Sequence, residues 1–377
     1  MRMAVPAETS AHETRVAATP ETIKKFIDLG CECVVQQGAG EAASIADEAY
    51  LEAGATLASS FQDACKDADL IVKVAALNQE ELKHVKSGTA VVSLCSPFNN
   101  PLLVDYAKAG LNIFCLEMIP RISRAQSMDV LSSQANIAGY KSILLALEHY
   151  KRFMPMLMTA AGTVQPARVL VMGAGVAGLQ AIATARRLGA MVEAFDVRAA
   201  AKEQVESLGA KFVEVPVDDA DGEDAGGYAK EMSDEYKQKQ AELIAEHAIK
   251  SDIIITTALI PGRPAPVLVT EETVCKMKMG SVIVDMAAEA GGNCPLTEKD
   301  AVWIYEGVTL VGISNIPALM ATDASQLFAR NVFNFTSPML SNESGGLSID
   351  MDDEVIAGAL LCQNGEFLKP QLLENKE

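Results

Sequence analysis

A glycine-rich turn between an apolar run and a helical pattern is the feature of this sequence with the clearest chemistry. The run at 169–172 leads into Gly-Ala-Gly-Val-Ala-Gly at 173–178. Glycines at this spacing permit a tight strand-to-helix turn, let backbone approach a pyrophosphate and let the helix pack closely on the strand. The first N–H groups of the helix then face the phosphates. The spacing predicts a dinucleotide site at Gly173, Gly175 and Gly178.

A carboxylate stands where this kind of site needs one. Asp196 ends the next apolar run, 191–195, about 20 residues after the turn, where it can accept hydrogen bonds from both ribose hydroxyls. It would also repel a 2′-phosphate, so the sequence favours NAD over NADP. Arg198 is compatible with a 2′-phosphate contact and with a solvated surface charge, and the pattern does not choose between them.

Few side chains are placed for the acid–base step that a dehydrogenase of hydroxy or amino acids needs. Of the four histidines, only His12 is a candidate, because it lies in the loop after the first predicted strand. The other three lie in helical, charged surroundings. Lys73, at the end of a predicted strand, is a second candidate, although a surface lysine fits the pattern at least as well.

The polar segment from Arg121 to Ser132 follows the last predicted strand of the first half of the chain. Arg121 and Arg124 can hold a carboxylate or phosphate, and Gln126 can both donate and accept hydrogen bonds to a carboxamide. The alternative is a polar loop in which Asp129 or Ser132 caps the next helix. The residue pattern alone favours this capping role.

The elements that must position these residues alternate along the chain. In the first half, predicted strands and helices lie at 2–5, 20–29, 33–36, 70–74, 80–85, 91–95, 101–109 and 112–116. The second half has six predicted strands, at 169–172, 191–195, 212–215, 253–256, 282–285 and 310–313. We therefore predict an α/β fold, with two doubly wound Rossmann-like parallel-sheet domains and a ligand cleft between them.

Two long helical patterns set the predicted domain boundaries. One, at 133–152, connects the halves, and another, at 323–334, returns to the first half. The prediction is a discontinuous N-terminal Rossmann-like domain (1–132 plus 321–377) and an NAD-binding Rossmann domain (133–320).

One segment, 216–240, breaks the alternation. It is acidic and contains Gly227 and Tyr228. A connection of this length is typical either of a disordered segment or of a working lid, and the sequence supports both equally.

Composition narrows the classes of protein. The chain has 377 residues, a formal charge of −19 and 49% hydrophobic residues, which indicates a globular protein and disfavours nucleic acid or an anionic membrane surface as a direct partner. Without a long uncharged apolar run or a secretory signal, we expect a cytoplasmic protein with no direct membrane insertion. The eight cysteines lack metal-ligand spacing, so we expect no metal site and buried thiols.

Taken together, several segments resemble the NAD(H)-binding alpha subunit (domain I) of proton-translocating NAD(P) transhydrogenase, in the family that also includes alanine dehydrogenase. The resemblance covers essentially the whole chain. It rests on residues 14–20, 121–140, 173–178, 196–198, 287–292 and 315–317.

Departures from the family pattern favour one branch. Alanine dehydrogenases carry a catalytic histidine after the strand equivalent to 91–95, where this chain reads Ser-Pro-Phe-Asn-Asn at 96–100. The carboxylate that they place after the strand equivalent to 282–285 corresponds here to Glu289, which is a change of side-chain length. Arg15 and Lys73 still match. Direct hydride transfer between two nicotinamide rings releases no proton and depends on positioning. The missing histidine is therefore what the transhydrogenase branch implies.

The resemblance also implies roles for individual residues. In that family Arg121, Gln126, Asp129 and Ser132 lie at the nicotinamide and face the NADP-binding partner, and a mobile loop matches Gly227, Tyr228 and Met232. Tyr228 joins the predicted catalytic set. The implied NAD(H) contacts are Gly173, Gly175, Val176, Ala177, Gly178, Asp196, Val197, Arg198, Gly227, Gln240 and Leu259.

The activity implied is that of a Re/Si-specific, proton-translocating NAD(P) transhydrogenase, alpha subunit. NAD(H) would bind here, NADP(H) on a partner component, and protons would move through a membrane-spanning component. The resemblance further implies a homodimer that is peripheral on the cytoplasmic face of the inner membrane. Two alternatives remain: an alanine dehydrogenase-like NAD-dependent oxidoreductase and a non-enzymatic NAD-sensing subunit.

Overall fold

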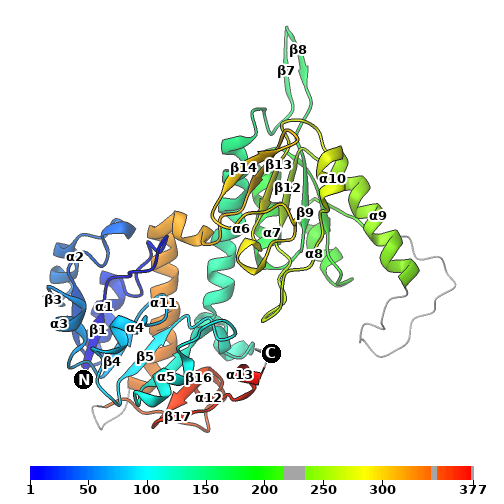
Figure 1. The fold of residues 1–377 in the computed structure, drawn as a ribbon. Coiled ribbons are helices and arrows are strands. Elements are labelled where there is room, and N and C mark those ends of the chain that lie inside the picture. Colours follow the sequence, from blue (N-terminus) through cyan, green and yellow to red (C-terminus); the bar gives the residue numbers. More distant parts are fainter. Residues whose placement is uncertain (215–233, 341–345, 375–377) are drawn as a thin grey trace. The chain divides into compact units, whose positions relative to one another are not determined.

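The computed structural model describes residues 1–214, 234–340 and 346–374. By its contacts the chain divides into two compact units (Figure 1). Unit 1 comprises Met1–Gln134 and Pro317–Glu377, and unit 2 comprises Ala135–Ile316. Each unit has its own sheet and its own buried core. Gly227, Tyr228 and Met232 lie outside the described residues.

Unit 2 is built on a seven-stranded sheet in the order β11-β10-β9-β12-β13-β15-β14. Six strands are parallel, and only the edge strand β14 runs antiparallel to its neighbour. The parallel strands follow the order 3-2-1-4-5-6, which is the full Rossmann arrangement. The bounds are β9 Arg168–Met172, β10 Met191–Phe195, β11 Lys211–Phe212, β12 Ile253–Thr256, β13 Val282–Asp285, β14 Val302–Tyr305 and β15 Val308–Val311.

The central strand β9 shows why these segments read as continuous apolar runs. Val169 and Val171 pack in one hydrophobic cluster, and Leu170 and Met172 pack in a cluster on the other face. Helices cover both faces, so both sets of side chains are removed from water. The helices of this unit include α7 (Val176–Arg187), α8 (Ala201–Ser207), α9 (Asp234–Lys250) and α10 (Glu271–Lys276).

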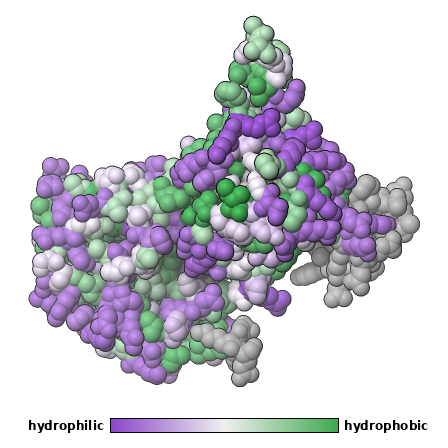
Figure 2. Space-filling view, turned by 45° about the horizontal axis from the view of Figure 1, so that its top comes forward, coloured by the Kyte–Doolittle hydropathy of each residue, from purple (hydrophilic) through white to green (hydrophobic). Residues whose placement is uncertain are grey.

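A hairpin that the sequence patterns did not indicate extends from unit 2. Its strands are β7 (Leu157–Thr159) and β8 (Gly162–Val164), which pair only with each other. Figure 1 shows it as a projection, and Figure 2 shows hydrophobic residues on it. Met158 is 73% exposed and Met156 is 55% exposed. Leu157 and Met158 of β7 are adjacent apolar residues that both face solvent, and β8 reads Gly-Thr-Val. Neither strand therefore shows the alternating pattern from which a strand is predicted.

Unit 1 has an eight-stranded sheet in the order β17-β16-β6-β5-β4-β1-β2-β3. The first six strands along the chain are parallel, and β16 adds antiparallel to β6. The bounds are β1 Arg2–Val5, β2 Glu32–Gln36, β3 Thr56–Ala58, β4 Leu70–Val72, β5 Ala90–Ser93, β6 Asn112–Cys115, β16 Leu360–Gln363 and β17 Glu366–Phe367. The five predicted strands are confirmed, whereas β3, β16 and β17 were not predicted.

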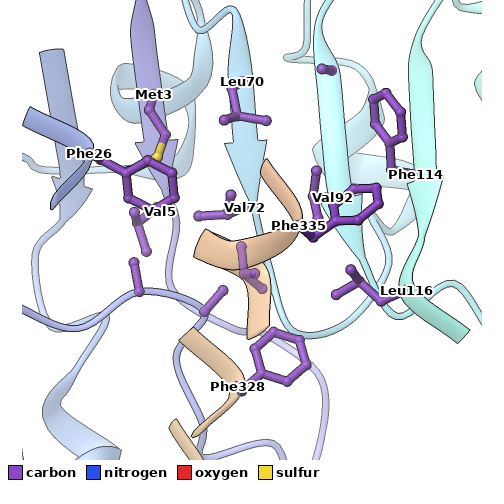
Figure 3. Packing of buried hydrophobic residues seen from close by; sticks show 14 of the residues in the cluster. Met3, Val5, Phe26, Leu70, Val72, Val92, Phe114, Leu116, Phe328 and Phe335 are labelled. Carbon is purple, nitrogen blue, oxygen red and sulfur yellow. The ribbon is translucent and has the colours of Figure 1, made fainter. Parts of the chain in front are cut away.

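The C-terminal part of the chain completes the core of unit 1. Helix α11 (Ala321–Leu340) lies on the sheet, with Phe328 and Phe335 fully buried among Val72, Val92 and Phe114 (Figure 3). The predicted helix at 323–334 is thus confirmed, and it extends further at both ends than predicted. The shorter helices of this unit are α1 Pro20–Asp28, α2 Asp47–Glu52, α3 Phe61–Cys65, α4 Gln79–Leu82, α5 Leu103–Lys108, α12 Glu354–Ala359 and α13 Gln371–Glu374.

Helix α6 (Val130–His149) begins three residues before the predicted start. A six-residue 3-10 helix, η3 (Ser123–Met128), precedes it. A bilayer-spanning helix would have to be both long and apolar, and none within the described ranges meets that requirement.

Candidate functional site

Two of the three fingerprint glycines are required by the fold itself. Gly173 has φ +102°, and a Cβ there would lie 2.4 Å from Thr257 Oγ1. A Cβ on Gly178 would lie 1.8 Å from the carbonyl oxygen of Gly173. The turn between β9 and α7 therefore tolerates no side chain at either position.

Gly175 is different, because a Cβ there would meet nothing within 4 Å. Its φ of −77° is open to any residue. No side-chain hydrogen bond from a described residue caps α7 at Gly175, so the first N–H groups of the helix lack a capping acceptor there. A missing side chain beside uncapped helix N–H groups fits a bound phosphate group.

Asp196 directly follows β10 and is tied to this turn. Its Oδ2 accepts a hydrogen bond from the Ala174 N–H at 2.6 Å. The Arg198 guanidinium donates to both oxygens, with Nε–Oδ1 and Nη2–Oδ2 distances of 3.0 Å, and the Arg198 N–H donates to Oδ1. The Asp196 side chain is 6% exposed and that of Arg198 is 62% exposed.

Opposing effects act on the pKa of Asp196. Burial raises it, but the hydrogen bonds from Arg198 and from the Ala174 N–H outweigh burial and hold the pKa below its ordinary value. The group is therefore an ionised acceptor at neutral pH. Arg198 is ion-paired, which neither of the two interpretations from sequence anticipated.

Exposed apolar side chains lie beside the glycine turn. Val176, Val197 and Leu259 are 39%, 65% and 56% exposed. They follow β9, β10 and β12, which are neighbours in the sheet. Ligands of open α/β sheets bind outside the carboxyl ends of strands where the strand order reverses, here between β9 and β12. These loops thus form one candidate binding surface.

Two residues that the sequence reasoning missed support this surface. Thr257 Oγ1 donates to the Gly173 carbonyl at 3.1 Å. The amide of Asn293, fully buried, donates to the Ala258 and Pro266 carbonyls and accepts from the Ala258 N–H. In the sequence, the role of Thr257 is indicated only by its position just after a predicted strand. Nothing in the sequence pattern indicates the role of Asn293.

Helix α6 also packs on the turn through a glycine. A Cβ on Gly139 would lie 2.1 Å from the carbonyl oxygen of Ala177, inside the fingerprint. The backbone of the two helices therefore touches at the first turn of α7. Gln240, also predicted to contact the dinucleotide, lies half-buried in α9.

In unit 1, the predicted hydride-transfer residues belong to η3 and its flanks. The side chains of Arg121 and Gln126 are exposed and make no hydrogen bond to any described residue. Asp129 accepts from the Ser132 N–H at 2.9 Å and from Ser132 Oγ at 2.6 Å. The capping role predicted for Asp129 is confirmed, and its role in hydride transfer stays a prediction.

Arg124, which the sequence also offered as a group to hold a carboxylate or phosphate, is paired with a carboxylate of the chain itself. It forms a two-pronged ion pair with Asp353, at 2.8 Å and 2.5 Å, and Asp353 also caps α12 by accepting from the Val355 N–H. The ion pair of Arg124 with Asp353 therefore links η3 to the N-terminus of α12.

Arg15 and Lys73, the residues shared with the alanine dehydrogenase pattern, are both buried and paired. Arg15 donates to both carboxylate oxygens of Glu13, at 2.8 Å and 2.7 Å. Lys73 Nζ lies 2.8 Å from Glu81 and 3.5 Å from Glu8. With Lys73 only 1% exposed, the interpretation as a surface lysine is wrong.

The loop that replaces the catalytic histidine of alanine dehydrogenases is held by Glu117. Its carboxylate accepts hydrogen bonds from the N–H groups of Cys95 and Ser96 and from the Cys115 thiol at 3.1 Å. Ser96 has φ +48°. Within the described ranges, Cys95, Cys115 and Glu117 are the one group of three potential metal ligands. Burial raises the pKa of the Cys115 thiol, which favours its protonated form. The protonated thiol can donate the hydrogen bond to Glu117.

The sequence spacing could not reveal this cluster, because adjacent strands β5 and β6 bring the two cysteines together. Seven cysteines are buried as expected, but Cys275 is exposed, so for this residue the expectation was wrong.

Comparisons with known proteins agree with the fold. The family models "Alanine dehydrogenase/PNT, N-terminal domain" and "Alanine dehydrogenase/PNT, C-terminal domain" match residues 4–138 and 142–370. An NAD(P) transhydrogenase alpha-subunit chain of Rhodospirillum rubrum is 50% identical over 380 residues, covering 99% of each chain. The NAD(P) transhydrogenase subunit alpha of Haemophilus influenzae is 44% identical over 99% of this chain and 73% of its own length.

A solved structure of transhydrogenase from Sinorhizobium meliloti has a TM-score of 0.89 and 47% identity, covering 98% of this chain and 100% of that chain. Matching models over nearly the whole length, together with relatives of this identity, establish the family. The chain belongs to the alanine dehydrogenase/PNT family.

Proposed function

We propose that this chain is the NAD(H)-binding component of a transhydrogenase, and that it transfers hydride directly between NAD(H) and NADP(H) bound on a partner component. The observation that carries the proposal is the turn at Gly173–Gly178, where Gly175 leaves space beside uncapped helix N–H groups. The identity of 50% with a transhydrogenase subunit supports the choice of branch. NADH, when bound, supplies the hydride.

The residues of unit 2 hold and orient the dinucleotide. The α7 N-terminus binds the pyrophosphate, and Asp196 accepts hydrogen bonds from the ribose hydroxyls. Val197 and Leu259 give apolar contact, and Gln240, Val176, Ala177 and Arg198 are the other contacts proposed from described residues. Gly227 is a further proposed contact.

The carboxylate of Asp196 gives preference for NAD. A 2′-phosphate would lie against an ionised and buried acceptor, which is costly without a free cation. Arg198 already neutralises Asp196, so it does not offer an unpaired charge to the phosphate.

In unit 1, Arg121, Gln126, Asp129 and Ser132 act at the nicotinamide, and Tyr228 acts with them. The exposed amide of Gln126 can donate to and accept from the carboxamide of the ring. No side chain need take a proton, because hydride passes from one nicotinamide to another. Orientation of the ring is the task of these residues.

We further propose the assembly that this activity needs. The partners are an NADP-binding component and a membrane-spanning component that translocates protons, with this chain peripheral on the cytoplasmic face of the inner membrane. A second copy of the chain covers the β7–β8 hairpin, whose exposed methionines are costly to leave in water. An open depression of about 460 Å³ at its base, lined by Tyr150, Arg152, Phe153 and Val164, offers room for a partner side chain.

Alanine dehydrogenase-like chemistry is the second candidate, favoured by the presence of Arg15 and Lys73. Both cations are neutralised inside the chain, and the loop at 96–100 has no histidine. The acid–base group of that reaction is therefore missing.

The two functions are separated by one pair of assays. The purified chain is mixed with the NADP-binding component of a transhydrogenase, NADPH and the 3-acetylpyridine analogue of NAD, and reduction of the analogue is followed by absorbance. The proposal predicts turnover only with the partner. Oxidation of NADH by the chain alone with pyruvate and ammonia would favour the second candidate.

A further inference from the structure

Two asparagines of α11 hold the backbone of η3 next to Gln126. The carbonyl oxygen of Ser127 accepts hydrogen bonds from Asn331 Nδ2 at 2.8 Å and from Asn334 Nδ2 at 3.0 Å. Residues three apart lie on the same helix face, so both amides reach one carbonyl. Asn331 is 7% exposed, and a buried amide in this position is costly unless its bonds are made.

Asn331 also binds the chain beyond Asp129. Ser133 Oγ donates to Asn331 Oδ1 at 2.7 Å. One carboxamide therefore joins Ser127 and Ser133, and the residues between them include Asp129 and Ser132. Only a side chain that donates at one atom and accepts at another can make this bridge.

The helix that carries the asparagines is a fixed support. Phe328 and Phe335 of α11 are buried in the core of unit 1 (Figure 3). Val332 of the same helix is buried in this core as well. Asp353, the N-cap residue of α12, binds Arg124 of η3. The short 3-10 helix with Gln126 is thus attached to two helices of the C-terminal part of the chain.

We propose that Asn331 and Asn334 are positioning residues for hydride transfer, which set the orientation of Gln126 and Asp129 through Ser127 and Ser133. The inference rests on the proposed function and extends it to residues that bind no ligand themselves. Hydride transfer depends steeply on geometry, so a shift of the segment by a fraction of an ångström slows the reaction without weakening dinucleotide binding.

The first experiment compares three variants in the hydride-transfer assay with the NADP-binding component. Asn331→Ala and Asn334→Ala remove the bonds to Ser127, whereas Arg330→Ala removes only an exposed ion pair with Glu21 and is the matched control. We expect the transfer rate to fall by about tenfold in the asparagine variants, with the Kd for NADH within about twofold of the parent. Asn334→Gln, which keeps a donor, should restore most of the rate.

A second readout needs no activity. Hydrogen exchange at the amides of Asp129, Ser132 and Ser133 reports whether the turn is held, because their N–H groups bond to Gln126 O, Asp129 Oδ1 and Asp129 O. We expect faster exchange there in both alanine variants and not in Arg330→Ala.

The outcomes separate the two claims. Unchanged exchange in both asparagine variants, or an equal loss of NADH binding and transfer rate, overturns the positioning role. No transfer by the parent chain overturns the proposed function, while the exchange result still decides whether the asparagines hold the segment. Should Asn331→Ala fail to fold in a thermal scan, the half-buried Asn334 supplies the test.

Discussion

The carboxylate of Asp196 accepts a hydrogen bond from the N–H of Ala174, with 2.6 Å between nitrogen and oxygen. This bond joins the end of β10 to the glycine turn after β9. The acceptor proposed for the ribose and the helix N-terminus proposed for the pyrophosphate are therefore fixed relative to each other within unit 2. Such prior fixing reduces the ordering cost of binding.

Replacing Asp196 tests the ribose contact. Asp196→Ala should weaken NADH binding by roughly 1.5–3 kcal/mol, the range for hydrogen bonds to a charged group. Arg198→Ala, measured beside it, should keep most of the affinity for NADH, because it removes the ion pair and leaves the acceptor. Titration calorimetry measures both, and equal affinities for the parent and Asp196→Ala would contradict the assignment.

The glycines of the turn give a matched pair. Gly178→Ala places a methyl group against the Gly173 carbonyl, so we expect a loss of about 1–3 kcal/mol or more in the free energy of unfolding. Gly175→Ala meets no described atom and should change stability by less than about 1 kcal/mol. Denaturant titration measures both.

For NADH binding, Gly175→Ala should be a damaging change, although it is the milder of the two changes for stability. In Gly175→Ala the new methyl group occupies the space proposed for the phosphates, so the Kd for NADH should rise by at least about tenfold, or about 1.4 kcal/mol. A folded Gly175→Ala variant that binds NADH as the parent does would remove the main support for the phosphate site.

The close approach of α6 to α7 at Gly139 is tested by whether Gly139→Ala raises or lowers the free energy of unfolding. Replacing glycine with alanine inside a helix normally stabilises it by about 1 kcal/mol. In Gly139→Ala the added Cβ would overlap the backbone of Ala177, so we predict a lower free energy of unfolding and weaker NADH binding. A variant more stable than the parent would show that α6 and α7 do not need this close approach.

The ion pair between Arg124 and Asp353 predicts a dependence on acid. Hydrogen bonds from Arg124 lower the pKa of Asp353 to about 2, whereas an unfolded aspartate titrates near about 4. Because the folded pKa is the lower one, the stabilisation is present above about pH 4 and is lost as the pH falls toward 2.

Asp353→Asn keeps an acceptor for the helix cap and removes the charge. The difference in unfolding free energy between parent and variant should be about 1 kcal/mol or less at neutral pH, since Arg124 is half-exposed. It should shrink toward zero near pH 2. A difference that is constant across this range would assign the stabilisation to the cap instead of the ion pair.

Sequence patterns predicted the elements that repeat a regular period. The central parallel strands of unit 2 were found because they are buried on both faces and read as apolar runs, as in Val169–Met172. Strands such as β17, with two residues, and the exposed β7–β8 hairpin carry no such signal.

The candidate site was predictable only where a motif marks it. The glycine turn and Asp196 lie at fixed spacing along the chain, whereas Asn293 and Asn331 act through contacts made by folding. Arg198 and Lys73 show the same limit, since a pattern of residues does not tell which carboxylate will pair with a cation.

The most direct test of the central claim is a stopped-flow measurement of hydride transfer between dinucleotides bound on this chain and on the NADP-binding component. NADPH is supplied to the partner, and the 3-acetylpyridine analogue of NAD to this chain. We predict a fast burst of analogue reduction that requires both proteins and is lost in Gly175→Ala. Absence of the burst, with NADH oxidised by the isolated chain in the presence of pyruvate and ammonia, would contradict the account.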